Sequence, residues 1–237
     1  MGGQEFTYAP RLEINDPNAA VFFGQLLRGT THKLNNILAV IHGFSSLLLM
    51  NESRDASEAE NLEQMKSAAK RASILGEQIL AAGGCSQVTV TEVNTDGLVS
   101  GLESSMRKPF EERQIRLEIV RDPELSNIST DASRLRDILI GLLENAAEAA
   151  AETGGTARIS FRPSSSESSR LEIMVENTGP SIPDMAAIYQ PFFSTKQGDH
   201  LGIGLTVVAV LCGQLDILLA GASSEGHTTF ILSVPVA

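Results

Sequence analysis

The chain has 237 residues, of which 42% are hydrophobic and 20% charged, as in an ordinary soluble globular protein of one or two domains. Its net charge of −11 argues against nucleic acid as a partner, because a phosphate backbone would be repelled. No apolar run reaches the roughly 20 residues that span a bilayer, and the two distant cysteines, Cys85 and Cys212, are typical of reduced thiols. We therefore expect a cytoplasmic protein with no direct membrane insertion.

Residues 1–16 are mixed in character and predict a short N-terminal arm. From about residue 17 to residue 50, apolar residues recur at steps of three and four, which predicts a long helix of coiled-coil type. The series is Ala20, Phe23, Leu27, Leu34, Ile37, Ile41, Phe44 and Leu48, with Thr30 as the one interruption. His32 falls on the opposite side of this helix, where water reaches it. A structural histidine has little reason to lie there, whereas a histidine that receives and passes on a chemical group does.

A second helix is predicted after a polar connection at residues 51–55. Its repeating residues are Leu62, Met65, Ala69, Ala72, Gly76 and Ile79. Two helices joined by a short polar loop make an antiparallel hairpin, here over residues 17–84, which ends at Gly83-Gly84. A lone hairpin leaves its seam in water, so we expect a homodimer whose two hairpins form a four-helix bundle.

A second domain is predicted over residues 85–237, where helical and strand patterns mix. Helices are expected at 93–106, from the N-cap Asp131 to 151, and at 204–214. Strands are expected at 115–120, 156–161, 171–175, 217–219 and 229–234. The predicted fold class is therefore α+β, with a helical hairpin followed by an α/β sandwich that has its helices on one face of the sheet.

Three motifs in this second domain could carry chemistry. Asn145 lies among apolar neighbours on its helix, where an amide oxygen needs a partner such as Mg²⁺ or, more commonly, a neighbouring protein group. Asn177 and Gly179 follow a predicted strand and could bind and underlie a flat base, although an ordinary turn has the same pattern. Lys196 with the Gly202-Ile203-Gly204 stretch suits phosphate binding at a helix start, although a lone Gly-x-Gly is weak.

The order of these motifs resembles the nucleotide-binding boxes of the histidine kinase ATPases, the Bergerat-fold group shared with gyrase, heat-shock protein 90 and MutL. Upstream, the His32-x-x-Asn35-Asn36 pattern resembles the dimerisation and phosphoacceptor domain of two-component sensor histidine kinases. The resemblance covers about residues 20–237. The short stretch between Phe193 and Gly202 looks most like the nitrogen-regulation subgroup, whose nucleotide lid is brief.

The resemblance implies a role for each matching residue. His32 would be the phosphoacceptor, and Asn36, one turn later on the same face, would aim a water during dephosphorylation of the partner regulator. The nucleotide ligand would be ATP with Mg²⁺, and the partner would be the receiver domain of a separate response regulator. The nucleotide residues implied are Asn145 for Mg²⁺, Asn177 and Gly179 for the base, and Lys196, Gly202 and Gly204 for the phosphates.

The chain departs from the family pattern at several positions. Lys33 follows His32 where the family has a Glu or Asp general base, Asn177 replaces the Asp that reads adenine, and Ser181 replaces a glycine. Gly141 stands where gyrase-like ATPases carry their water-activating Glu, which disfavours a structural ATPase of that group. Two functions stay open: a kinase that phosphorylates itself on His32 from ATP, and a relay protein that keeps the kinase fold and moves phosphate between receivers.

Overall fold

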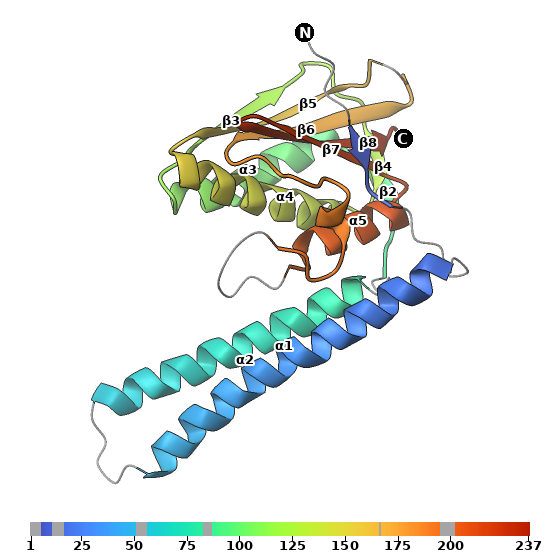
Figure 1. Cartoon of the computed structure of the whole chain (residues 1–237). Coiled ribbons are helices and arrows are strands. Elements are labelled where there is room, and N and C mark those ends of the chain that lie inside the picture. Colours follow the sequence, from blue (N-terminus) through green and yellow to red (C-terminus); the bar gives the residue numbers. More distant parts are fainter. Residues whose placement is uncertain (1–5, 11–16, 51–55, 83–86, 166, 195–201) are drawn as a thin grey trace.

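A computed structural model of the chain describes residues 6–10, 17–50, 56–82, 87–165, 167–194 and 202–237. Within the two long helices it defines only the backbone of several residues, among them His32. The chain forms a helical hairpin and, above it in Figure 1, a sandwich of one sheet with helices on a single face. The predicted α+β class is confirmed. None of the described helices is both long enough and apolar enough to cross a membrane.

The hairpin consists of α1 (Pro17–Met50) and α2 (Ala56–Ala82), which have the predicted bounds, whereas the connection at 51–55 lies outside the described residues. Of the predicted α2 series, Ala72 and Ile79 pack on the hairpin cluster as expected, whereas three other members do not pack against α1 in the single chain. Leu62 is 56% exposed, and Ala69 and Gly76 are exposed as well. The buried residues are instead Ala68, Leu75 and Ala82. Two stripes run side by side along α2 at a spacing of seven residues, and a single neighbouring helix covers only one of them.

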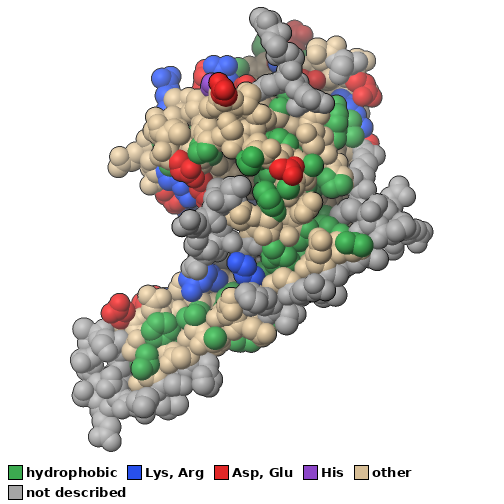
Figure 2. Space-filling model, viewed as in Figure 1, with side chains coloured by type: hydrophobic (Ala, Val, Ile, Leu, Met, Phe, Trp, Pro, Cys, Tyr) green, Lys and Arg blue, Asp and Glu red, His purple; other side chains and the backbone are tan. Residues whose placement is uncertain are grey.

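Hydrophobic side chains therefore remain on the surface of the hairpin (Figure 2). Leu34, which the periodicity assigned to the packed seam, is 37% exposed, and Leu38 and Leu47 of the same helix are each 50% exposed. On α2 the exposed leucine is Leu62. Ile37 is buried as predicted, together with Leu26, which the predicted series did not contain. One chain thus leaves an apolar stripe of each helix uncovered.

A six-stranded sheet forms one layer of the sandwich, with the strand order β1-β7-β8-β6-β5-β3. All neighbours are antiparallel except β3 and β5, which are parallel. The strands are β1 (Thr7–Tyr8), β3 (Arg116–Arg121), β5 (Thr156–Pro163), β6 (Arg170–Thr178), β7 (Leu218–Ser224) and β8 (His227–Pro235). Part of the predicted N-terminal arm thus joins the sheet, because β1 pairs with the edge strand β7 and the Ala9 amide donates to the Leu219 carbonyl oxygen at 2.9 Å.

Two short strands, β2 (Thr91–Val93) and β4 (Ile128–Thr130), pair separately and were not predicted, because three residues are too few to show an alternating pattern. Helix α3 (Thr95–Glu111) begins two residues later than predicted, since Val93 still belongs to β2. Asn94 ends the strand and caps the helix, with its Oδ1 accepting from the Gly97 amide at 2.8 Å.

Helix α4 (Ala132–Thr153) begins, as predicted, after the N-cap Asp131. The Asp131 carboxylate accepts from the backbone amides of Ser133 and Arg134 and from the amide of Thr89 at 2.8 Å. Burial by itself raises the pKa of this carboxyl, but these hydrogen bonds and one from the Ser133 hydroxyl outweigh it and lower the pKa to about 2. Asp131 therefore fixes the start of the helix that carries Asn145 and ties it to the segment that follows the hairpin.

Helix α5 (Gly204–Gln214), with the predicted bounds, lies between the sandwich and the hairpin (Figure 1). On one side its residues Val208 and Leu211 enter the core of the sandwich. On the other side Ile203, at its start, is fully buried in a cluster with Leu26 and Leu75 of the hairpin. The position of α5 thus links the two parts of the chain by apolar packing.

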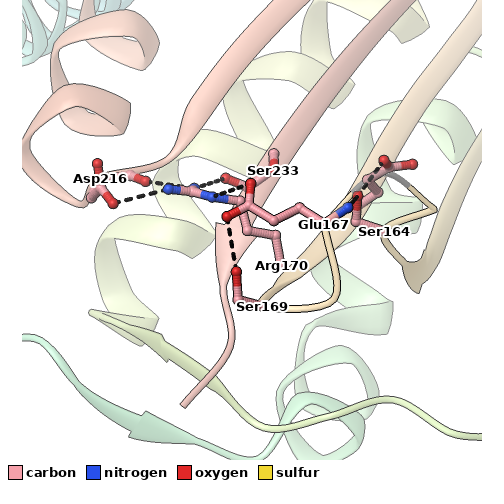
Figure 3. Close-up of polar contacts among 7 residues, drawn as sticks. Ser164, Glu167, Ser169, Arg170, Asp216 and Ser233 are labelled. Carbon is pink, nitrogen blue, oxygen red and sulfur yellow. Dashed lines mark hydrogen bonds and ion pairs between the residues drawn. The ribbon is translucent and has the colours of Figure 1, made fainter.

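A charged cluster around Arg170 lies at the corner between α5 and β7 (Figure 3). The Arg170 guanidinium, at the start of β6, donates to the backbone oxygens of Asp216 and Ser233 and to the Asp216 carboxylate, each at 3.0 Å. Glu167 lies 3.5 Å from the Arg170 Nε and also accepts from the Ser169 hydroxyl. Because the Arg170 side chain is only 13% exposed, these bonds fix the corner between α5 and β7 to the neighbouring strands.

Candidate nucleotide and phosphoacceptor site

Helix α4 presents Asn145, half-buried, between two positions at which neighbouring elements approach closely. One turn earlier, a Cβ built on Gly141 would lie 3.2 Å from the Val208 Cγ2 of α5. One turn later, Ala149 contacts the segment that follows β6. A carboxylate side chain at position 141 would have to enter the α4–α5 packing, which gives a structural reason for the missing Glu.

Asn177, which is predicted to bind the nucleotide base, lies close to α4, but its position in the sheet differs from the prediction. Asn177 lies within β6, paired with Ala157 and Thr228, and not after the strand as predicted. Asn177 is 5% exposed and lies two residues after the core residue Val175 on the same strand. Because side chains alternate along a strand, both lie on the helix-covered face of the sheet. Its Nδ2 donates to the Thr178 carbonyl oxygen at 3.1 Å, so its amide oxygen is oriented as the acceptor.

Gly179 needs to be a glycine because of α4. A Cβ at this position would lie 2.8 Å from the Ala149 carbonyl oxygen, which is closer than side-chain carbons approach backbone oxygen. The chain after β6 therefore lies directly on the helix, one turn from Asn145. The structure in this way brings together three of the predicted residues, Asn145, Asn177 and Gly179, from two elements far apart in the sequence.

Acidic groups gather next to Asn145 on the exposed side of α4. Burial raises the pKa of the Glu144 carboxyl, the like charge of Glu148 raises it further, and the Arg113 guanidinium opposes both. Arg113 itself lies 3.5 Å from Glu148. Among the residues that the structure describes, no group of three or more His, Cys, Asp or Glu side chains could hold a metal ion.

The predicted phosphate residues lie at the start of α5. Gly202 has a left-handed φ of 64°, and a Cβ there would lie 2.8 Å from the backbone carbon of Phe192. Gly204 begins the helix with open space around its Cβ position. The N-cap Ile203 makes no side-chain cap, so the first amides of α5 are not capped by their own N-cap residue, as they would be by Ser, Thr, Asp or Asn. Lys196 lies outside the described residues.

The predicted acceptor residues lie in the middle of α1. The His32 side chain is outside the described part of the chain, so its predicted exposure stays a prediction. Lys33 is half-buried and Asn36 is exposed, one turn past His32. One turn before His32, Gly29 contacts the ring of Phe192. The segment before the phosphate loop thus lies against the acceptor helix.

Phe192 and Gly29 are the residues that the sequence interpretation missed. The sequence pattern assigned no role to Phe192, which precedes the short stretch between Phe193 and Gly202, and it treated Gly29 as an ordinary helix residue. A lone glycine within a helical pattern costs about 1 kcal/mol relative to alanine. A glycine at position 29 therefore indicates that another part of the protein packs closely there, but the sequence does not identify the neighbouring residue.

A cavity of about 320 Å³ lies along β3, β5, the end of β6 and the start of β8. Charged side chains of β3, β5 and β6 line it, and of the predicted nucleotide residues only Asn177 reaches it. It is separate from the start of α5 and from Asn145, so we do not assign the nucleotide to it.

Residues 130–237 match the family of histidine kinase-, DNA gyrase B- and HSP90-like ATPases. The chain is also similar to sensor kinases over nearly its whole length. It is 30% identical over 218 residues to the sensory histidine kinase/phosphatase NtrB of Rhodobacter capsulatus, an alignment covering 87% of this chain and 60% of that protein. It is 26% identical over 228 residues to the sensor histidine kinase ZraS of Escherichia coli K12, with coverages of 94% and 48%.

Solved structures share the fold. The histidine kinase ThkA, in its complex with the response regulator protein TrrA, covers 93% of this chain and 64% of that chain with a TM-score of 0.72 and 20% sequence identity. A second structure, of the catalytic domain of ThkA, aligns with 62% of this chain and with 96% of its own length, with a TM-score of 0.54 and 25% sequence identity. The chain spans about half the length of ZraS and 60% of NtrB, so those proteins contain segments with no counterpart here.

Proposed function

We propose that this chain, a histidine kinase core of two-component systems, transfers the γ-phosphoryl group of ATP to His32 and then to an aspartate of a separate response-regulator receiver domain. One observation carries the proposal. The helix whose start is expected to bind phosphates, α5, packs with Ile203 directly on the hairpin that contains His32. The proposed phosphate-binding helix start would thus lie against the proposed acceptor helix of the same chain.

The nucleotide would bind between α4, the end of β6 and the start of α5. The Asn177 amide oxygen would accept from the adenine amino group, and the glycine backbone at Gly179 would lie under the base. The uncapped amides around Gly202 and Gly204 would donate to the phosphates, and the ammonium of Lys196 would add positive charge.

Magnesium fits the oxygen chemistry available at Asn145. The amide is half-buried, and the absence of a carboxylate cluster among the described residues means that phosphate oxygens and water would complete the coordination. Bound there, Mg²⁺ would neutralise charge on the transferring group. Asn145 would orient the phosphates, and α4 would hold Asn145 in place through Asp131 and its contacts at Gly141 and Ala149.

Transfer to His32 would use the lone pair of the neutral imidazole. A phosphorus–nitrogen bond forms, the bond between the γ-phosphorus and the ADP oxygen breaks, and the imidazole proton passes to water or a base. Lys33 provides no such base, and the loss of a general base typically costs about 10²–10⁴-fold. We propose that Lys33 instead attracts phosphate, and that Asn36, exposed one turn later, orients a water for dephosphorylation of the regulator.

We further propose that residues 17–84 form a dimerisation and phosphoacceptor domain, residues 85–237 an ATP-binding domain and residues 1–16 an arm. The predicted boundary near residue 84 lies outside the described residues. The uncovered leucines of the hairpin, Leu34, Leu38 and Leu62 among them, support a homodimer because a second hairpin would bury them.

A relay protein is the second candidate, and Lys33 favours it. Lys33 lacks the carboxylate of the family's general base, and Asn177 lacks the charge of the Asp that reads adenine, so both changes would weaken the use of ATP. Against a relay, the chain retains Asn145, Lys196 and the glycine pair Gly202 and Gly204, and a relay would have no use for a phosphate and Mg²⁺ site.

One experiment distinguishes these functions. The full chain is incubated with Mg²⁺ and γ-labelled ATP, and acid-labile, alkali-stable label is measured on wild type, His32→Ala and His42→Ala, a control histidine on the same helix. We expect label on wild type and on His42→Ala but not on His32→Ala. Absence of label together with acceptance of phosphate from a phosphorylated receiver would establish the relay. Nucleotide binding without label in either assay would refute both.

A further inference from the structure

Phe192 is held between two glycines that come from different parts of the chain. Its backbone has a left-handed φ of 64°, a conformation that is a genuine outlier for a bulky residue. On the side of the phosphate loop, a Cβ at Gly202 would lie 2.8 Å from the Phe192 backbone carbon and 2.9 Å from the Phe193 carbonyl oxygen. On the side of the hairpin, a Cβ at Gly29 would overlap the Phe192 ring. Each glycine therefore admits Phe192 only because it lacks a side chain.

The contact between Phe192 and Gly29 lies between the start of α5, where the phosphates are proposed to bind, and the helix that carries His32. Gly29 precedes His32 by three residues, about 4.5 Å along the helix axis, and Gly202 precedes the first residue of α5 by two. Phe192 packs on the same buried cluster that joins Ile203 to Leu26 and Leu75. The ring is thus seated at the edge of a dry contact between the start of α5 and α1.

Two glycines of α1 differ in the space around them. Gly29 and Gly43 both lie in α1, where glycine is a poor helix former. A Cβ at Gly43 would meet nothing within 4 Å, whereas a Cβ at Gly29 would collide with Phe192. Position 29 therefore has a steric requirement that position 43 lacks, and the requirement comes from the catalytic domain.

We propose that Phe192 is a positioning residue for phosphoryl transfer, whose ring on Gly29 sets the distance between the phosphate-binding start of α5 and His32. The inference rests on the proposed kinase function. Phosphoryl transfer depends chiefly on positioning, so an error of about 1 Å costs up to about a hundredfold in rate. Because Gly202 lies closely against the Phe192 backbone, an obstacle at position 29 would displace the ring or the whole domain.

The test compares Gly29→Ala with Gly43→Ala in the full chain. Both changes favour the helix, so neither should unfold the hairpin. For Gly29→Ala we expect the maximal rate of autophosphorylation from Mg-ATP to fall about ten- to a hundredfold. The nucleotide dissociation constant, measured by calorimetry, should stay within about twofold of wild type, because the binding residues are untouched. Gly43→Ala should match wild type in both quantities.

A second substitution tests the identity of the contact. In Gly29→Ala/Phe192→Leu the smaller side chain makes room, so the rate should recover toward that of Phe192→Leu alone and exceed that of Gly29→Ala, a non-additivity expected of touching residues. The inference is overturned if Gly29→Ala equals Gly43→Ala, if it is faster than wild type, if nucleotide affinity falls in proportion to rate, or if Phe192→Leu brings no recovery. Failure of wild type and Gly43→Ala to label at all would overturn the kinase function, and the inference with it.

Discussion

Replacing Gly179 by alanine probes the base site at the point where the chain has least room. The backbone at Gly179 does not need a left-handed conformation, so the effect of an added methyl group comes only from its contacts. The new Cβ would lie 2.8 Å from the Ala149 carbonyl oxygen and 3.0 Å from the Ala149 Cβ. An ordinary carbon–oxygen contact is about 3.4 Å, so the end of β6 must move away from α4 by about 0.6 Å.

The expected cost has two parts. Overpacking of this size destabilises a fold by about 1–3 kcal/mol, which a urea titration followed by circular dichroism would measure. The displacement also shifts Asn177 and the surface under the base relative to Asn145, and a loss of about 1.4 kcal/mol in binding would raise the nucleotide dissociation constant about tenfold. Gly213→Ala serves as control, because a Cβ at Gly213 of α5 meets nothing within 4 Å.

Two results would refute this reasoning in different ways. Unchanged stability, equal to that of Gly213→Ala, would mean that the approach of Gly179 to Ala149 is not a constraint. Lower stability with unchanged nucleotide affinity would mean that the constraint is real but that the base does not lie on this segment.

Three further predictions concern single residues. Lys33→Glu should restore a general base beside His32 and raise the initial rate of autophosphorylation about 10²-fold, with unchanged nucleotide affinity; a rate equal to wild type would contradict the assigned role. Asn177→Asp should tighten nucleotide binding about tenfold, because a charged acceptor bonds more strongly to the adenine amino group; weaker binding in calorimetry would speak against that contact. Asp131→Ala should destabilise the fold at pH 7 by about 1–2 kcal/mol through loss of the α4 cap. Because the folded pKa is lowered from 3.8 to about 2, the part of this stabilisation that comes from the charge is present above pH 3.8 and lost as the pH falls toward 2, so wild type and variant should converge in acid. Denaturant midpoints that stay equally far apart from pH 7 to pH 2 would contradict this account.

Local chemistry explains why much of this protein could be predicted from sequence. Helix periodicity, the Asp131 cap and the glycines before α5 act within a few residues, so the bounds of α1 and α5 and the start of α4 agree with the predictions. The same locality explains the misses. β2 and β4 are too short to show a pattern, and the strand containing Asn177 continues because β5 and β8 pair with it on both sides.

The sequence by itself determined the fold class, the two-helix hairpin and the set of nucleotide motifs, because these follow from residue spacing along one element. Only the tertiary structure decided which stripe of α2 is buried, since Ala68 and Leu75 or their neighbours Ala69 and Gly76 could equally face a partner until one helix covers one of them. It alone also set Phe192 between Gly29 and Gly202, residues 173 positions apart in the chain. The local sequence shows such a requirement only as a glycine, because the atoms that exclude a larger side chain belong to another helix or loop.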